Sequence, residues 1–97
     1  MSELFLRPTL PGETGDFVVM SDGRQIGRIR SSYDNIHHKS LWTWNITVPL
    51  PMPPWGSGAA DSLDAAKAAF RSAWERFYAS LSEKEIHHWH QTGDAHK

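Results

Sequence analysis

The most regular segment of the chain is Leu41-Trp-Thr-Trp-Asn-Ile-Thr-Val48. Large apolar side chains alternate there with polar ones, which is the period of a β-strand with one buried and one solvated face. The buried face carries two tryptophans and two β-branched residues, Trp42, Trp44, Ile46 and Val48. A strand with so large an apolar face has to pack against another element of matching size.

The matching element is a helix that begins at about Leu63, capped by Asp61 or Ser62. Its apolar residues recur at helical spacing and form one stripe, opposite a charged, solvated stripe. The apolar stripe consists of Leu63, Ala66, Phe70, Ala73, Trp74, Phe77 and Leu81. The spacing Ser82-x-x-Glu85 is that of a capping box, so the helix either restarts there or continues with a kink toward Trp89.

Two more strands are predicted before this segment. Residues 16–20 are rich in β-branched and aromatic side chains, and residues 25–30 form the return strand. Between them, Asp22-Gly23 favours a tight two-residue hairpin turn, because both positions tolerate a positive φ angle. Residues 31–40 are polar and predict a connecting loop.

Together these elements predict an α+β fold, in which a three-stranded antiparallel sheet carries one long C-terminal helix on one face. A second short helix is the alternative for the end of the chain. The length of 97 residues fits a single domain. Its expected parts are an extended leader (1–15), the sheet (16–48), a proline and glycine crossover (49–60), a helical region (61–92) and a frayed tail (93–97).

Composition excludes several classes of protein. The chain has no cysteine, which excludes a disulfide scaffold, a thiolate zinc site and a thiol nucleophile. Ten Lys and Arg stand against eleven Asp and Glu, and neither half of the chain has the basic excess expected of a phosphate-binding protein. No apolar run approaches the roughly 18 residues of a membrane span, and no signal-peptide core is present. We therefore expect a cytoplasmic protein.

The candidate site is the outer face of the sheet. If Gly27 and Ile29 face the core, a two-residue turn puts apolar residues of the first strand beside arginines of the second on the outer face. Such a mixture is common at partner-binding surfaces, and Trp89 is a further exposed candidate. The candidate contact residues are Phe17, Val19, Arg24, Ile26, Arg28, Arg30 and Trp89. The alternative is that residues 4–6 fold over this patch as a fourth strand or lid, which would make it core.

Other motifs are explained more simply by structure than by chemistry. In His87-His-Trp-His90 the histidines lack the spacing of four that places two zinc ligands on one helix face. The loop motif of His37 and His38 with Asp34 and Asn35 has no nucleophile motif beside it. We therefore expect no metal, no cofactor and no enzymatic activity. The proline segment 49–55 contains P-x-x-P spacing that an aromatic groove could bind, although a rigid crossover suffices to explain it.

Two resemblances bear on function. A three-stranded sheet with arginines on its open face and one helix resembles the arm-binding domains of tyrosine-recombinase integrases and the plant AP2-type domain, which lay the sheet in a DNA groove. The segments that carry it are Gly27-Arg-Ile-Arg30, Trp42-Thr-Trp44 and Ser62-Leu-Asp-Ala-Ala-Lys-Ala-Ala-Phe70.

The whole chain also resembles short, uncharacterised bacterial proteins of β-β-β-α order. These pair a Trp-x-Trp strand with a helix start similar to Gly58-Ala-Ala-Asp-Ser-Leu-Asp-Ala-Ala-Lys67. This second resemblance implies a fold and no activity. From the residues we expect a non-enzymatic module that binds an unknown protein partner or a second copy of itself, with DNA binding through the outer sheet face as the alternative.

Overall fold

A five-stranded antiparallel sheet and two helices make up the structure, a computed structural model that describes residues 3–12 and 14–94. The strands follow one another in the sheet in chain order, β1-β2-β3-β4-β5. Their bounds are β1 Leu4–Pro8, β2 Asp16–Ser21, β3 Arg24–Asp34, β4 Lys39–Ile46 and β5 Ser57–Ala60. A short 3₁₀ turn, η1 (Pro54–Gly56), precedes β5, and the helices are α1 (Leu63–Ala79) and α2 (Glu83–Asp94). The α+β class predicted from the sequence is therefore correct, whereas the predicted number of strands is too small.

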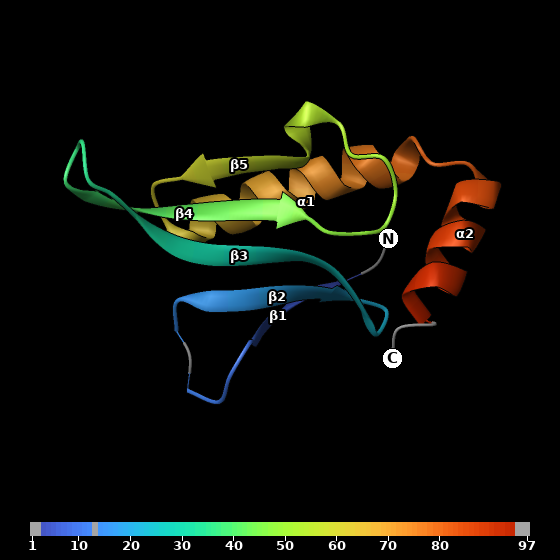
Figure 1. Ribbon diagram of the computed structural model, residues 1–97, viewed down its shortest axis with the longest axis horizontal. Helices are drawn as coiled ribbons and strands as arrows, with labels where there is room; N and C mark the ends of the chain where they lie inside the picture. The colour runs from blue at the N-terminus through green and yellow to red at the C-terminus, as the bar shows by residue number, and fades with distance from the viewer. Residues whose placement is uncertain (1–2, 13, 95–97) are drawn as a thin grey trace.

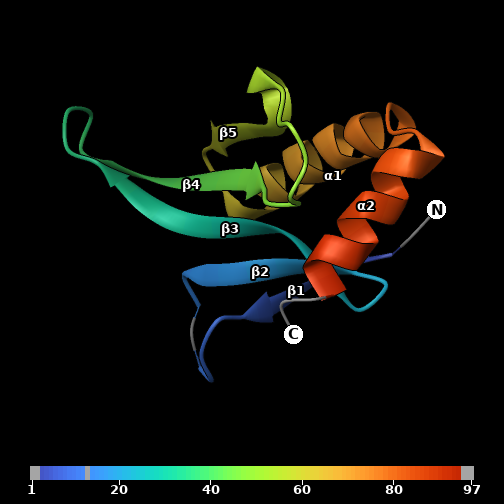
Figure 2. The same ribbon diagram turned by 45° about the vertical axis from the view of Figure 1, so that its right-hand side comes forward.

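Helix α1 lies on one side of the sheet, and α2 stands at one end of the strands (Figures 1 and 2). In Figure 1, α1 runs behind β4 and β5, and α2 stands beyond one end of the strands. No element of the described residues crosses in front of the sheet in this view. The sheet thus has a helix face and an uncovered face.

The two additional strands are at the two edges of the sheet. β1 pairs with β2 over five residues, within the segment predicted to be an extended leader. β5 pairs with β4 within the segment predicted to be a crossover. Neither strand has the alternation of large apolar and polar residues that marks β4, because an edge strand needs only one paired side and contributes few core residues.

The β2–β3 hairpin has the predicted turn and an unpredicted bulge. Asp22 and Gly23 have φ angles of 51° and 78°, as a tight two-residue turn requires. Met20 pairs with Gln25, but Val19 pairs with Gly27, so Ile26 is an extra residue on β3. A bulge of this kind reverses the facing of every paired residue beyond it.

The β3–β4 hairpin extends much further than predicted. Pairing continues from Gly27 with Ile46 to Asp34 with Lys39, so most of the predicted loop at 31–40 is strand. The remaining turn has a positive φ angle at His38. Figure 1 shows this hairpin projecting beyond the neighbouring strands. The sequence did not predict these strand residues, because the projecting part has no helix to pack against and therefore lacks the apolar alternation of a half-buried strand.

Helix α1 follows the predicted stripe closely. The Oγ of Ser62 accepts a hydrogen bond from the N–H of Ala65, so Ser62 is the N-cap. The buried residues of the helix are Ala66, Phe70, Ala73, Trp74 and Phe77. They form one core with buried side chains of β2, β3 and β4 and with Val48 and Trp89.

Two glycines of the sheet lie directly under aromatic rings. The Phe70 ring covers Gly27, and a Cβ there would also lie 2.6 Å from the backbone oxygen of Asn45. The Trp44 indole covers Gly58, where a Cβ would lie 2.8 Å from Cζ2. Phe70 and Trp44 themselves meet edge to face at 6.1 Å. The close approach of α1 to the sheet therefore depends on the absence of a Cβ at Gly27, and the position of the Trp44 indole over β5 depends on its absence at Gly58.

Helix α2 is a separate helix that begins with the predicted capping box. Ser82 N–H donates to the Glu85 carboxylate at 2.9 Å, and Glu85 N–H donates to Ser82 Oγ at 3.1 Å. The helix continues to Asp94, two residues beyond the predicted end at 92. The tail predicted for 93–97 is therefore partly helical, and residues 95–97 lie outside the described residues, as do Met1, Ser2 and Glu13 of the predicted leader.

The remaining tryptophans lie at the two ends of the core. Trp55 is half-buried and meets Phe77 at 6.4 Å, with the Arg76 guanidinium 4.1 Å from the centre of its ring. Trp42 is half-buried and stacks on Phe17 at 6.4 Å.

Among residues 3–12 and 14–94, no helix is both long and apolar enough to cross a membrane.

Candidate functional site

The uncovered face of the sheet presents three rows of side chains that run across the strands. The register places in the first row Phe5, Met20 and Gln25, in the second Arg7, Val18, Arg28, Asn45 and Ser57, and in the third Asp16, Arg30, Thr43 and Ala59. These rows contain three arginines and one aspartate. We call this surface the arginine face.

An ion pair joins two strands on the arginine face. Arg28 Nε and Nη2 donate to the two carboxylate oxygens of Asp16 at 2.9 and 2.6 Å. These hydrogen bonds, more than the charges of Arg28 and Arg30, hold the pKa of Asp16 below its usual value. They also raise the pKa of Arg28. Because the fork geometry of guanidinium matches a carboxylate, the pair fixes the Arg28 head group beside β2.

The predicted placement of the apolar contact residues on the outer face is wrong. Val19 and Ile26 are 1% and 0% exposed and belong to the core on the helix face. Phe17 pairs with Ile29 on that same face and stacks on Trp42. The reason is the extra residue at Ile26, since the prediction assumed an unbroken register from the turn.

Two further predicted contact residues lie on the helix side. Arg24 is half-buried in a hollow lined by residues that include Trp74 and His90. Trp89, predicted to be exposed, is 4% exposed and packs edge to face on Trp74 at 5.7 Å. Sequence periodicity missed this contact, because only the break between the helices turns α2 back onto the core.

Arg28 and Arg30 are on the outer face, as the sequence predicted, and the structure adds Arg7 from β1. Val18, which stands between Arg7 and Arg28, is only 8% exposed although it lies outside the core cluster. The aliphatic stems of long arginine side chains can cover an apolar neighbour in this way. The alternative that residues 4–6 form a further strand is right as to the strand, but that strand extends the sheet sideways and leaves its outer face open instead of covering it. Arg7 was missed because the alternative strand ended at residue 6.

A second candidate surface, which is concave, lies on the helix side between β1 and α1. A hollow of about 590 Å³ is lined by Leu4, Asp22, Arg71, Trp74, Glu75, Tyr78 and Ala79. An adjoining hollow of about 80 Å³ shares Leu4 and Arg71 with it and adds Phe5, Leu6, Val19, Ile29, Lys67 and Phe70. We call the two together the β1–α1 groove. It exists because α1 packs on the β4–β5 side of the sheet and leaves β1 beside it uncovered.

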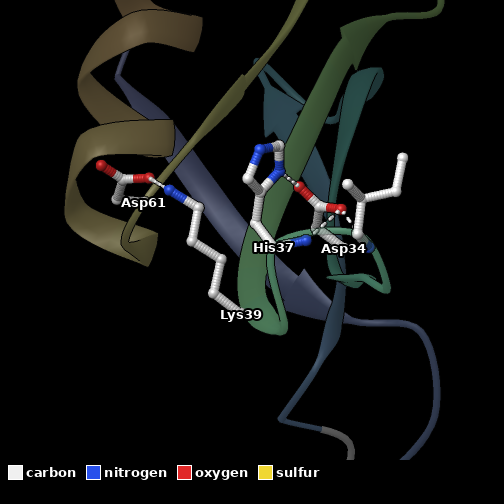
Figure 3. A network of polar contacts seen from close by, with 5 residues as sticks. Asp34, His37, Lys39 and Asp61 are labelled. Carbon is white, nitrogen blue, oxygen red and sulfur yellow. Dashed lines mark hydrogen bonds and ion pairs between the residues drawn. The ribbon is translucent and has the colours of Figure 1, made fainter.

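The tip of the β3–β4 hairpin holds a cluster of polar contacts (Figure 3). Asp34 Oδ1 accepts hydrogen bonds from the N–H groups of Ile36 and His37 at 2.9 and 3.2 Å, and Oδ2 lies 2.6 Å from His37 Nδ1. The hydrogen bond with the His37 ring, followed by those with the backbone, lowers the pKa of Asp34. Lys39 and Asp61 form a longer ion pair at 3.5 Å.

This tip lacks the parts of a hydrolytic site. The His37 side chain is 70% exposed, and within the described residues no hydroxyl is hydrogen-bonded to its ring. A general base needs both a nucleophile within hydrogen-bond reach and a pocket for substrate. Asp34 instead fixes the turn through its backbone contacts, as Asp does in Asx turns.

No metal site emerges from the part of the chain that the structure describes. Within it, no three or more His, Cys, Asp or Glu side chains are grouped as a metal ion would require. In α2, Trp89 stands between His88 and His90. His88 is exposed, whereas His90 is half-buried and its ring contacts the Trp89 ring.

Comparison with other proteins gives no guide to function. No family model matches the chain, and neither a curated protein nor a solved structure matches it. The resemblances drawn from sequence segments therefore stay predictions, and function has to be argued from the arginine face and the β1–α1 groove.

Proposed function

We propose that the protein is a non-enzymatic binding module that uses the arginine face to bind an acidic surface of a partner protein. One observation carries this proposal: α1 covers only one side of the five-stranded sheet, and the three rows of the arginine face on the other side bear three arginines against one aspartate. Arginine is enriched at protein interfaces, and its planar guanidinium forms paired hydrogen bonds with carboxylates.

The charges of this face support an acidic partner. Asp16 is already bound to Arg28, whereas Arg7 and Arg30 are exposed and form no ion pair within the described residues. Thr43, Asn45 and Ser57 continue the same rows with exposed hydroxyl and amide groups that can hydrogen-bond a partner. The polar character also explains how the face stays solvated when no partner is bound.

DNA binding through the same arginines is the second candidate. It rests on Arg7, Arg28 and Arg30, which could contact phosphates. Two observations favour a protein partner. The net charge of the chain is −1, and Phe5 is the only aromatic residue in the three rows, so the face offers no series of rings for stacking bases.

Nuclear magnetic resonance can test the proposal with poly-glutamate and a random DNA duplex as probes. Poly-glutamate should shift the amide signals of Arg7, Val18 and Arg28, and Arg30→Glu should weaken its binding severalfold at low ionic strength. Lys84→Glu in α2 is the matched control, since it reverses one exposed charge on a residue that belongs neither to the arginine face nor to the β1–α1 groove. If the duplex bound more tightly than poly-glutamate with a steep salt dependence, DNA binding would replace the proposal. If neither probe shifted these amides, the arginine face would have no binding role.

A further inference from the structure

The β1–α1 groove combines an open strand edge with a helix wall. β1 is the edge strand of the sheet, and only β2 pairs with it. Thr9 N–H donates to the Asp16 carbonyl at 3.2 Å, so the backbone of odd-numbered residues faces β2. The N–H and C=O groups of Leu4 and Leu6 therefore point to the open edge, because successive residues of a strand alternate in direction. Such groups are a template for a further strand.

The side chains of a strand added to this edge would enter the groove. Leu4 and Leu6 face the helix side and pack against the core, so every second residue of an added strand would point the same way. Along β1, Leu4 lies at the larger hollow with Trp74 and Tyr78. Leu6 lies at the smaller hollow with Lys67 and Arg71.

Charge distinguishes the two ends of the groove. Lys67 and Arg71 are exposed on the wall of the smaller hollow and form no ion pair within the described residues. The larger hollow shares Arg71 with the smaller one, and it combines the apolar side chains of Leu4 and Trp74 and the ring of Tyr78 with the acidic residues Asp22 and Glu75, which the smaller hollow lacks. An incoming segment therefore complements the groove when it places an acidic side chain near Lys67 and, two residues away, an apolar side chain near Tyr78.

We propose that the β1–α1 groove binds an extended segment of a partner protein, which adds to β1 as an antiparallel sixth strand and carries the pattern acidic-x-apolar. The antiparallel direction places the acidic residue first, because a strand running against β1 passes Leu6 before Leu4. Backbone hydrogen bonds to Leu4 and Leu6 supply affinity, and the two pockets supply specificity, as in other cases of strand addition. Phe5 borders both this site and the arginine face, but the site uses none of the three arginines of that face.

The test uses the peptide acetyl-Thr-Glu-Thr-Leu-Thr-amide, with binding followed by amide shifts of the full chain. The peptide should shift the signals of Leu4, Leu6, Arg71 and Tyr78. The peptide with Glu and Leu exchanged, and the peptide with Lys in place of Glu, should each bind about threefold to tenfold more weakly. A peptide with an N-methyl group on an amide that faces β1 should lose binding, because it removes a backbone donor without touching the protein.

Protein variants separate this site from the arginine face. Lys67→Glu/Arg71→Glu should weaken the peptide by about tenfold and leave poly-glutamate binding to the outer face intact, since it removes the wall charges only. Arg30→Glu should have the opposite effects.

Three outcomes would overturn the proposal: equal binding of the exchanged peptide, no effect of N-methylation, and shifts confined to the arginine face. A concentration-dependent dimer that broadens the β1 amides without peptide would identify a second copy as the occupant and overturn it as well.

Discussion

The two faces of the sheet are built from alternate residues of the same strands, yet they differ in how deeply their side chains are buried and in how polar they are. On the helix face, Phe70 and Trp44 cover the backbone of two glycines and meet each other edge to face. On the arginine face, polar side chains outnumber the apolar Phe5, Val18, Met20 and Ala59, and Arg28 forms an ion pair with Asp16. Burial of aromatic surface contributes kilocalories per side chain, whereas exposed ion pairs contribute little. The comparison indicates that the helix face maintains the fold, which leaves the arginine face free to serve binding.

The largest expected effect follows from truncating the ring at the centre of the helix face. Phe70→Ala should lower the free energy of unfolding by about 3–5 kcal/mol, because it removes a ring that is 1% exposed and leaves a cavity. Thr43→Ala on the arginine face should change it by no more than about 0.5 kcal/mol. Urea unfolding measures both, and equal losses would show that the two faces do not divide stability as described.

Adding a methyl group where none fits tests the contact between helix and sheet. Gly27→Ala should destabilise by about 1–3 kcal/mol, because the new Cβ would overlap the Phe70 ring and crowd the Asn45 carbonyl. The loss should be smaller when Gly27→Ala is made in a Phe70→Leu background, since the smaller side chain can move away. Strict additivity of the two changes would contradict the close packing of Phe70 on Gly27.

A third prediction concerns how α2 is held on the helix side. Ser82→Ala should cost about 1 kcal/mol, because it removes the oxygen that accepts the N–H of Glu85. Helicity measured by circular dichroism should fall at the same time, and Ser72→Ala, in the exposed middle of α1, is the control. An unchanged unfolding curve would mean that Trp89 alone fixes α2 against Trp74.

The smallest effect is expected on the arginine face and depends on pH. The pKa of Asp16 is lower in the folded state than in the unfolded state, where it is about 3.9. The ion pair with Arg28 therefore stabilises the fold at pH values above about 3.9, and this stabilisation is lost as the pH falls through the folded-state pKa. Asp16→Asn should therefore reduce stability slightly at neutral pH and not at all in acid. Unfolding curves between about pH 2 and pH 7 measure this. A difference that stays constant across that range would exclude the ion pair as its cause.

Local patterns in the sequence predicted the elements that have strong signals of their own. The alternation around Trp42 and Trp44 predicted β4, Asp22-Gly23 predicted the tight turn, and Ser82-x-x-Glu85 predicted the break between the helices. The edge strand β5 was missed and β1 was considered only as an alternative that covers the outer face, because their pairing comes from the packing of the whole sheet. The groove was missed with them, since it forms only where β1 and α1 lie beside each other.

For the candidate site, the sequence by itself determined the residue types, and the tertiary structure decided which of them reach solvent. The alternation of β2 and the turn at Asp22-Gly23 are local, so they could be recognised from the residues alone. The bulge at Ile26 is not local: it lets both Ile26 and Gly27 face α1, where Ile26 fills the core and Gly27 admits the Phe70 ring. That single extra residue turned Val19 inward and left arginines to dominate the outer face, because a strand register is set by the packing of the whole sheet.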